Sequence, residues 1–116
     1  MSLNITQDDG IVVISPNGPM NAITAPSIQE EINGTMAGVD SRVALNLANV
    51  PFVSSHGLRT VIQTARLVKS ETGTTLVVCG MEAQIDQIFR LAGLNRIVEI
   101  CQDVDAMKEL TNTVVE

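Results

Sequence analysis

Short runs of apolar residues alternate along this chain with longer segments whose apolar residues recur every three or four positions. The short runs predict β-strands, and the longer spacing predicts helices that bury one face. After a hairpin-like first segment, strand and helix therefore alternate, which predicts an α/β fold with right-handed crossovers and a mostly parallel sheet. The expected strands are 11–15, 43–48, 74–79 and 97–100, separated by helices.

Turn and capping residues set the expected ends of these elements. Residues 16–19 (PNGP) end the first strand, and Asn33-Gly34 ends the first helix. Thr72-Gly73 ends the second helix, and Gly93 closes the third with a left-handed cap backed by Leu94. Asp103 is expected to cap a last helix whose apolar face carries Val104, Met107 and Leu110.

The second helix has the clearest periodicity in the chain. Its apolar stripe consists of Leu58, Val61, Ile62, Ala65 and Val68, and its opposite face of Arg59, Thr60, Gln63, Arg66 and Lys69. Three of the seven Lys and Arg residues therefore lie on one helix face of a chain whose net charge is -6. This face suits an acidic partner surface, and a solvated helix face explains the same pattern equally well.

Composition narrows the function classes. With 116 residues, of which 45% are apolar, the chain fits one domain over 1–116 with a single core. The absence of Trp and Tyr and the net charge of -6 argue against direct nucleic-acid binding. We expect no membrane insertion and a cytoplasmic location, because no basic leader and no apolar run of about 18 residues is present.

The two cysteines are expected to be buried, reduced thiols. Cys79 and Cys101 lie far apart in apolar contexts, without the paired spacing of a zinc site or a redox dithiol. The sequence therefore predicts neither a metal site nor a cofactor.

The stretch VPFVSSHGLR, residues 50–59, raises three alternatives for Ser54 and Ser55. Either serine could cap the helix that follows, with Ser54 the better candidate. Ser55 could be a nucleophile, but the only histidine is its neighbour His56, which is poorly placed as a base, and no G-x-S-x-G elbow is present. Finally, Ser55 could be a phosphorylation site at a helix N-terminus, where the dipole favours added phosphate.

Gly57 allows two interpretations. The missing side chain leaves backbone open to the close approach of a partner, and it equally suits tight packing of the helix against the sheet.

The element order and the stretch LNLANVPFVSSHGLR resemble the STAS domains of bacterial anti-sigma factor antagonists. In that family a strand leads through F-(M/I/V)-D-S-S-G-L into a long helix. The segments LVVCG at 76–80 and IFRLAGL at 88–94 resemble two further family segments in the same order. The resemblance implies a single STAS-like α/β domain, with a mostly parallel sheet of four to five strands and about four helices packed mainly on one face.

The resemblance assigns phosphorylation to Ser55, with Ser54, His56 and Gly57 as its cap and neighbours. This chain departs from the best-known members, which carry Asp where it has Ser54 and Ser or Thr where it has His56. The family segment G-x-(L/I)-D appears here as Gly18-Pro19-Met20-Asn21. The partner-binding residues are expected to be Asn21, Leu58, Arg59, Gln63 and Arg66.

The family mechanism is partner switching without catalysis by the domain itself. Unphosphorylated, the protein would bind an anti-sigma factor that is a serine kinase of the GHKL type and so release a sigma factor. Phosphorylation of Ser55 would dissociate the complex, and a PP2C-type phosphatase would restore the unphosphorylated serine. The protein itself would be a monomer or a weak dimer.

Two other functions remain open from the sequence. A lone STAS subunit of an ABC transporter or a signalling scaffold would use Ser55 only as a helix cap. A small hydrolase would use it as a nucleophile.

Overall fold

The computed structural model describes residues 2–108, which contain one sheet with the strand order β1-β2-β3-β4-β5. The strands β1 and β2 are antiparallel, and the remaining neighbours are parallel. The predicted α/β class with a mostly parallel sheet is therefore confirmed. The strands are β1 (Ser2–Asp8), β2 (Ile11–Asn17), β3 (Arg42–Asn46), β4 (Val77–Cys79) and β5 (Glu99–Cys101).

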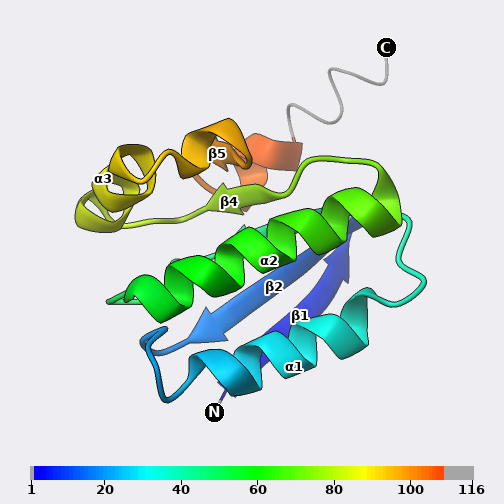
Figure 1. Ribbon diagram of the computed structural model, residues 1–116. Coiled ribbons are helices and arrows are strands. Elements are labelled where there is room, and N and C mark those ends of the chain that lie inside the picture. Colours follow the sequence, from blue (N-terminus) through cyan, green and yellow to red (C-terminus); the bar gives the residue numbers. More distant parts are fainter. Residues whose placement is uncertain (1, 109–116) are drawn as a thin grey trace.

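Helices cover the two faces of this sheet unequally. The helices α1 (Ala25–Met36) and α2 (Ser55–Thr72) lie side by side over one face (Figure 1). They share the main core with α3 (Ala83–Leu91) and the 3-10 helix η1 (Leu94–Arg96). The other face carries a smaller cluster that includes Met107, from the helical residues 104–108. Within the described part of the chain, the helices thus pack mainly on one face.

The strand β1 was not predicted as an element of its own. Its side chains Leu3 and Ile5 are partly buried and pack against the main core, which is the alternation expected of a strand with one face on the core. Asp9 and Gly10 connect it to β2 with positive φ angles of 53° and 76°. Two such residues form the type I′ turn that matches the twist of a hairpin, and Asp-Gly is a preferred sequence for it.

The predicted end of the first helix at Asn33-Gly34 was wrong, since α1 continues to Met36. Ile28, Ile32 and Met36 are fully buried at a spacing of four residues. Burying an apolar side chain contributes about 1.5–3 kcal/mol, more than the helix propensity of one glycine costs.

Thr60 was wrongly assigned to the polar face of α2. Both Thr60 and Thr64 are buried, and Thr60 lines a hollow together with Ala25 and Gln29 of α1. The hydroxyl of Thr64 donates a hydrogen bond of 2.8 Å to the backbone carbonyl of Thr60. Thr64 can therefore be buried here, because its hydroxyl is satisfied within the helix.

The C-terminal elements are shorter than predicted or shifted. The strand β4 begins at Val77 instead of residue 74, and the last strand is 99–101 instead of 97–100. Gly93 has the left-handed φ of 79° that was expected. Asp103 caps residues 104–108, because its Oδ1 accepts from the backbone N–H of Ala106 at 2.8 Å. Leu110 lies outside the described residues.

Candidate functional site

Two loops meet where the parallel strands β2 and β3 end, and backbone hydrogen bonds hold them together. The N–H of Met20 donates to the carbonyl of Phe52 at 2.8 Å, and the N–H of Ser54 donates to the carbonyl of Met20 at 2.8 Å. Met20 and Val53 form a parallel bridge. The start of α2 is therefore fixed against the loop that leads into α1.

Ser54 is the N-cap residue of α2, as predicted. Its Oγ accepts hydrogen bonds from the backbone N–H groups of His56 at 3.2 Å and Gly57 at 3.5 Å. Its backbone is extended, with φ -85° and ψ 179°, which is the usual conformation of a capping residue. The hydroxyl of Ser54 is thus committed to the helix.

Ser55 is the first residue of α2 and is exposed. Its hydroxyl has no hydrogen-bond partner among residues 2–108. His56 is also exposed and lines a hollow between α1 and α2, without a hydrogen bond to Ser55. Within the described residues, the geometry of a serine nucleophile beside its base is therefore not formed.

Gly57 is buried, and the structure supports the packing interpretation of this glycine. A Cβ placed on it would lie 2.7 Å from the carbonyl oxygen of Met20 and 2.8 Å from Cγ1 of Val53. The backbone at Gly57 is already covered by these two loops, so the idea that it lies open to a partner was wrong.

Asn21 organises the loop before α1. Its Oδ1 accepts from the backbone N–H groups of Ile23 at 2.9 Å and Thr24 at 3.1 Å. In return, the backbone N–H of Asn21 donates to Oγ1 of Thr24 at 3.0 Å, and that hydroxyl donates to the carbonyl of Pro19 at 2.7 Å. Asn21 and Thr24 thus form reciprocal side-chain caps that hold this loop in one shape.

The four remaining predicted binding residues lie along α2. Leu58 is partly buried and packs against the main core, whereas Arg59, Gln63 and Arg66 are exposed. Arg59 and Gln63 line the same hollow as His56. The structure therefore brings Arg59 and Gln63 into one hollow with His56, the neighbour of Ser55, while Arg66 lies further along the helix.

Sequence reasoning missed two apolar residues at this end of the domain. Ile23 is 86% exposed and Phe52 is 54% exposed, in the two loops that the Met20 backbone bonds hold together. Exposed apolar surface that gathers in one place often marks a protein–protein contact. Both residues lie next to turn residues and outside any periodic apolar stripe. This position in the sequence was the signal that could have indicated their exposure.

The two cysteines are buried and reduced, as predicted. They are register neighbours on β4 and β5. Burial, with a smaller contribution from Cys101, raises the pKa of the Cys79 thiol to about 12. Burial also raises the pKa of Cys101. Both thiols therefore stay protonated at neutral pH, and no group of metal-binding side chains occurs among residues 2–108.

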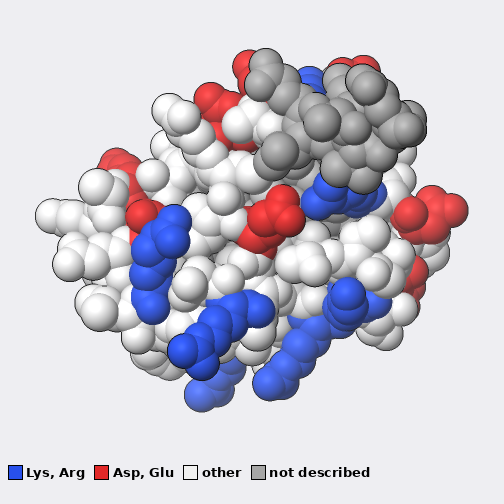
Figure 2. Space-filling view, turned by 90° about the horizontal axis from the view of Figure 1, so that it is seen from above, with Lys and Arg blue, Asp and Glu red and all other residues white. Residues whose placement is uncertain are grey.

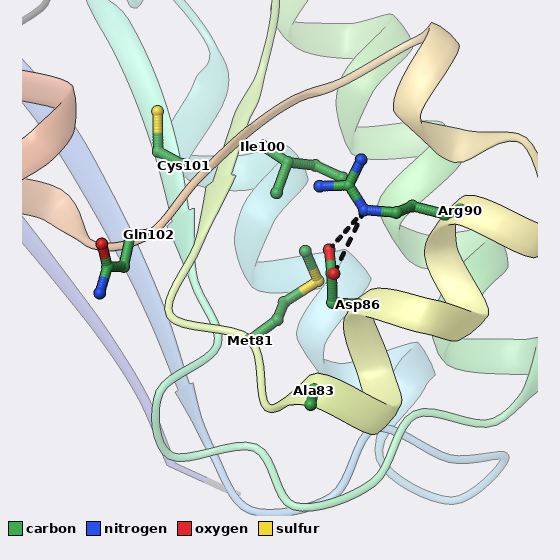
Figure 3. A pocket seen from close by; sticks show the side chains of 7 residues that line it. All are labelled: Met81, Ala83, Asp86, Arg90, Ile100, Cys101 and Gln102. Carbon is green, nitrogen blue, oxygen red and sulfur yellow. Dashed lines mark hydrogen bonds and ion pairs between the residues drawn. The ribbon is translucent and has the colours of Figure 1, made fainter.

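A second hollow, of about 420 Å³, lies where β4 and β5 end. Asp86 and Arg90 point toward each other in it, and Arg90 Nε donates to both carboxylate oxygens at 3.1 and 3.2 Å (Figure 3). The two charges compensate each other, so this hollow presents no unpaired charge. In residues 2–108, no helix is long and apolar enough to cross a membrane.

A family model described as the STAS domain matches residues 2–107. BtrV of Bordetella bronchiseptica, named as a candidate anti-sigma factor antagonist, is 26% identical over 91% of this chain and 90% of its own length. The structure of an anti-sigma factor antagonist from Mycobacterium paratuberculosis has a TM-score of 0.81 and 23% identity, covering 93% of this chain and 92% of that one.

The anti-sigma factor antagonist SpoIIAA has the same fold. Its unphosphorylated form has a TM-score of 0.71 and 14% identity, covering 97% of both chains. The phosphorylated form of SpoIIAA, a Bacillus cell fate determinant, has a TM-score of 0.70 and 15% identity, covering 94% of this chain and 99% of that one.

Proposed function

The chain belongs to the STAS domain family, and we propose that it is an anti-sigma factor antagonist controlled by phosphorylation of Ser55. In the unphosphorylated form it binds an anti-sigma factor that is itself a serine kinase of the GHKL type. Phosphorylation ends this binding, and a phosphatase of the PP2C type restores it.

The observation that carries this proposal is that the adjacent hydroxyl groups of Ser54 and Ser55 have different roles. Ser54 Oγ accepts the capping hydrogen bonds, while the hydroxyl of Ser55 is exposed and makes no hydrogen bond within residues 2–108. A kinase can therefore modify Ser55 without removing the cap. Because Ser55 is the first residue of α2, the helix dipole also favours a phosphate there.

The surroundings of Ser55 support a contact that phosphate can disrupt. Ile23 and Phe52 present apolar surface from the two neighbouring loops, and Arg59 is exposed one turn further along α2. A phosphate adds about -1.5 to -2 charges. Placed in a contact that contains apolar side chains, this charge must be desolvated when the partner binds, and the desolvation weakens binding.

The named relatives support the same role. BtrV carries the name of a candidate anti-sigma factor antagonist, and SpoIIAA has been solved in phosphorylated and unphosphorylated forms. The substitution of Ser54 for the family Asp is compatible with this mechanism, because serine caps a helix about as well as aspartate.

The test is a pull-down from the native cytoplasm with wild type, Ser55→Asp and Ser70→Asp as baits, followed by mass spectrometry and calorimetry. Ser70 is an exposed serine of the same helix, so its variant controls for added charge. We expect wild type and Ser70→Asp to hold a GHKL-type serine kinase and Ser55→Asp to bind it more than tenfold more weakly.

Equal binding of the kinase by all three baits would reject the switch. Recovery of the ATPase of a transporter by all three would instead support the lone STAS subunit.

A further inference from the structure

A groove of about 400 Å³ lies between the C-terminal half of α2 and η1, well away from the Ser55 loops. We call it the α2–η1 groove. Its side chains come from three segments: α2, the residue Thr75 before β4, and the end of η1. The residues that line it include Ile62, Arg66, Lys69, Thr75, Arg96 and Ile97.

The cations of this groove lack acidic partners. Three of the chain's seven Lys and Arg residues form ion pairs: Arg42 with Glu99, Arg90 with Asp86 and Lys108 with Asp9. The other four have no carboxylate within 4.0 Å in the part of the chain that the structure describes, and three of them line the groove: Arg66, Lys69 and Arg96.

The positive charge is therefore concentrated, although the chain as a whole carries a net charge of -6. Figure 2 shows several basic side chains gathered along one border of the molecule, with most acidic side chains on other parts of this view. Unpaired like charges close together repel each other, and a ligand of opposite charge relieves this repulsion.

Apolar surface accompanies the charge. Ile97 lines the groove and is 45% exposed, and Ile62 is only partly buried. Apart from Ile23 and Phe52 near Ser55, the large exposed apolar residues of the described chain all belong to α3 and the segment after it, namely Ile88, Leu91 and Ile97. An amphipathic helix lays its apolar face into an apolar groove, and charges beside the groove favour a partner of the opposite charge.

We propose that the α2–η1 groove is a second docking surface, and that it binds an acidic amphipathic helix of a partner protein. Apolar side chains of that helix lie against Ile62 and Ile97, and its carboxylates pair with Arg66, Lys69 and Arg96. The groove walls contain no unpaired strand edge, so an added β-strand would gain no backbone hydrogen bonds here.

This surface is independent of the proposed phosphorylation. Arg66 and Lys69 follow Ser55 by 11 and 14 residues on one helix, which separates their backbones by about 17–21 Å at 1.5 Å per residue. A charge at Ser55 is screened over such a distance, since the Debye length is about 8 Å at physiological ionic strength. Binding in the groove therefore persists in the Ser55→Asp variant.

The test uses an 18-residue helical peptide with Leu on one face and Glu on the other, and a control peptide with Gln in place of Glu. We expect the Glu peptide to bind at least fivefold more tightly than the Gln peptide in low salt. In amide NMR spectra, it should shift the signals of residues 62–69 and 96–97. The affinity of Ser55→Asp should equal that of wild type.

The variants Arg96→Gln and Arg90→Gln form a matched pair, because each removes one charge and Arg90 is already paired with Asp86. We expect Arg96→Gln to weaken peptide binding at least threefold and Arg90→Gln to change it less than 1.5-fold. The proposal would be overturned if the two variants had equal effects, or if the signal shifts were confined to other surfaces. It would also be overturned if the Glu peptide did not bind at 1 mM, which corresponds to about 4 kcal/mol of binding free energy. Tighter binding to duplex DNA or to phosphatidylglycerol vesicles than to the peptide would overturn it as well.

Discussion

Gly57 lies so close to Met20 that a methyl group on its α-carbon would come within 2.7 Å of the Met20 carbonyl oxygen. This carbonyl also accepts the N–H of Ser54 at 2.8 Å. The same backbone atom therefore holds the β3–α2 loop and limits the size of residue 57. Because Ser54 makes one of these two contacts and Ser55 lies between Ser54 and Gly57, the positions of both serines depend on this glycine.

We predict that Gly57→Ala lowers the free energy of unfolding by about 1–2 kcal/mol. The added methyl meets backbone that cannot rotate away, and overpacking of this kind typically costs about 1–3 kcal/mol, offset in part by the better helix propensity of alanine. The measurement is urea unfolding followed by circular dichroism.

The matched control for that prediction is Gly34→Ala in α1. Gly34 is exposed, has a negative φ and has no atom within 4 Å of an added Cβ. Alanine should therefore stabilise the protein here by about 0.5–1 kcal/mol. If both substitutions changed stability by the same amount, the close contact with Met20 would not limit residue 57.

Ser54→Ala should cost about 1 kcal/mol of stability, because it removes the side chain that accepts the N–H groups of His56 and Gly57. Ser54→Asp keeps an acceptor at the same place and should leave the denaturant midpoint near that of wild type. Ser55→Ala should change stability by less than 0.5 kcal/mol, about the limit for an exposed site. Equal losses at both serines would mean that they share the cap.

Phe89 anchors the short helix α3 in the main core. It is fully buried, whereas Leu91, two residues later, is 81% exposed. We predict that Phe89→Ala lowers the free energy of unfolding by about 3–5 kcal/mol, and that Leu91→Ala changes it by less than 0.5 kcal/mol. Thermal or urea unfolding of the two variants measures this difference, and a large loss at Leu91 would contradict the assigned faces of α3.

Elements with a complete apolar period could be predicted from the sequence. The helix α2 was found from its stripe, and Ser54 and Gly93 mark helix ends by local chemistry that does not depend on the rest of the fold. The end of α1 could not be found in this way. Its last turn is held by the burial of Met36, which is a tertiary contact that overrides the local preference of Asn33 and Gly34.

The site was only partly predictable for the same reason. The stretch around Ser55 could be recognised from adjacent residues, whereas the exposed position of Ile23 depends on the Asn21 and Thr24 hydrogen bonds. The α2–η1 groove joins residues 62–69 with 96–97, and no local pattern indicates that Arg96 and Arg66 line the same groove. Contacts between distant segments of this kind come only from the fold.

The buried thiol of Cys79 should make stability depend on alkaline pH. In the folded protein burial raises its pKa from the ordinary value of 9.0 to about 12. Between these values the unfolded chain loses the proton while the folded chain keeps it. Since the unfolded state then binds fewer protons, stability is fully present below pH 9 and falls as the pH rises toward 12, by at most about 1.4 kcal/mol per pH unit for this group.

This dependence can be measured because the chain has no tyrosine that titrates in the same range. Urea unfolding of the reduced protein at pH 8, 9 and 10 should give a falling free energy of unfolding. Cys79→Ala should flatten the fall, even though the smaller side chain lowers stability at every pH. Cys101→Ala should also flatten it, since burial raises the pKa of Cys101 itself and its charge is one of the lesser causes that raise the pKa of Cys79. An equally steep fall in Cys79→Ala would show that groups other than this thiol cause the alkaline loss.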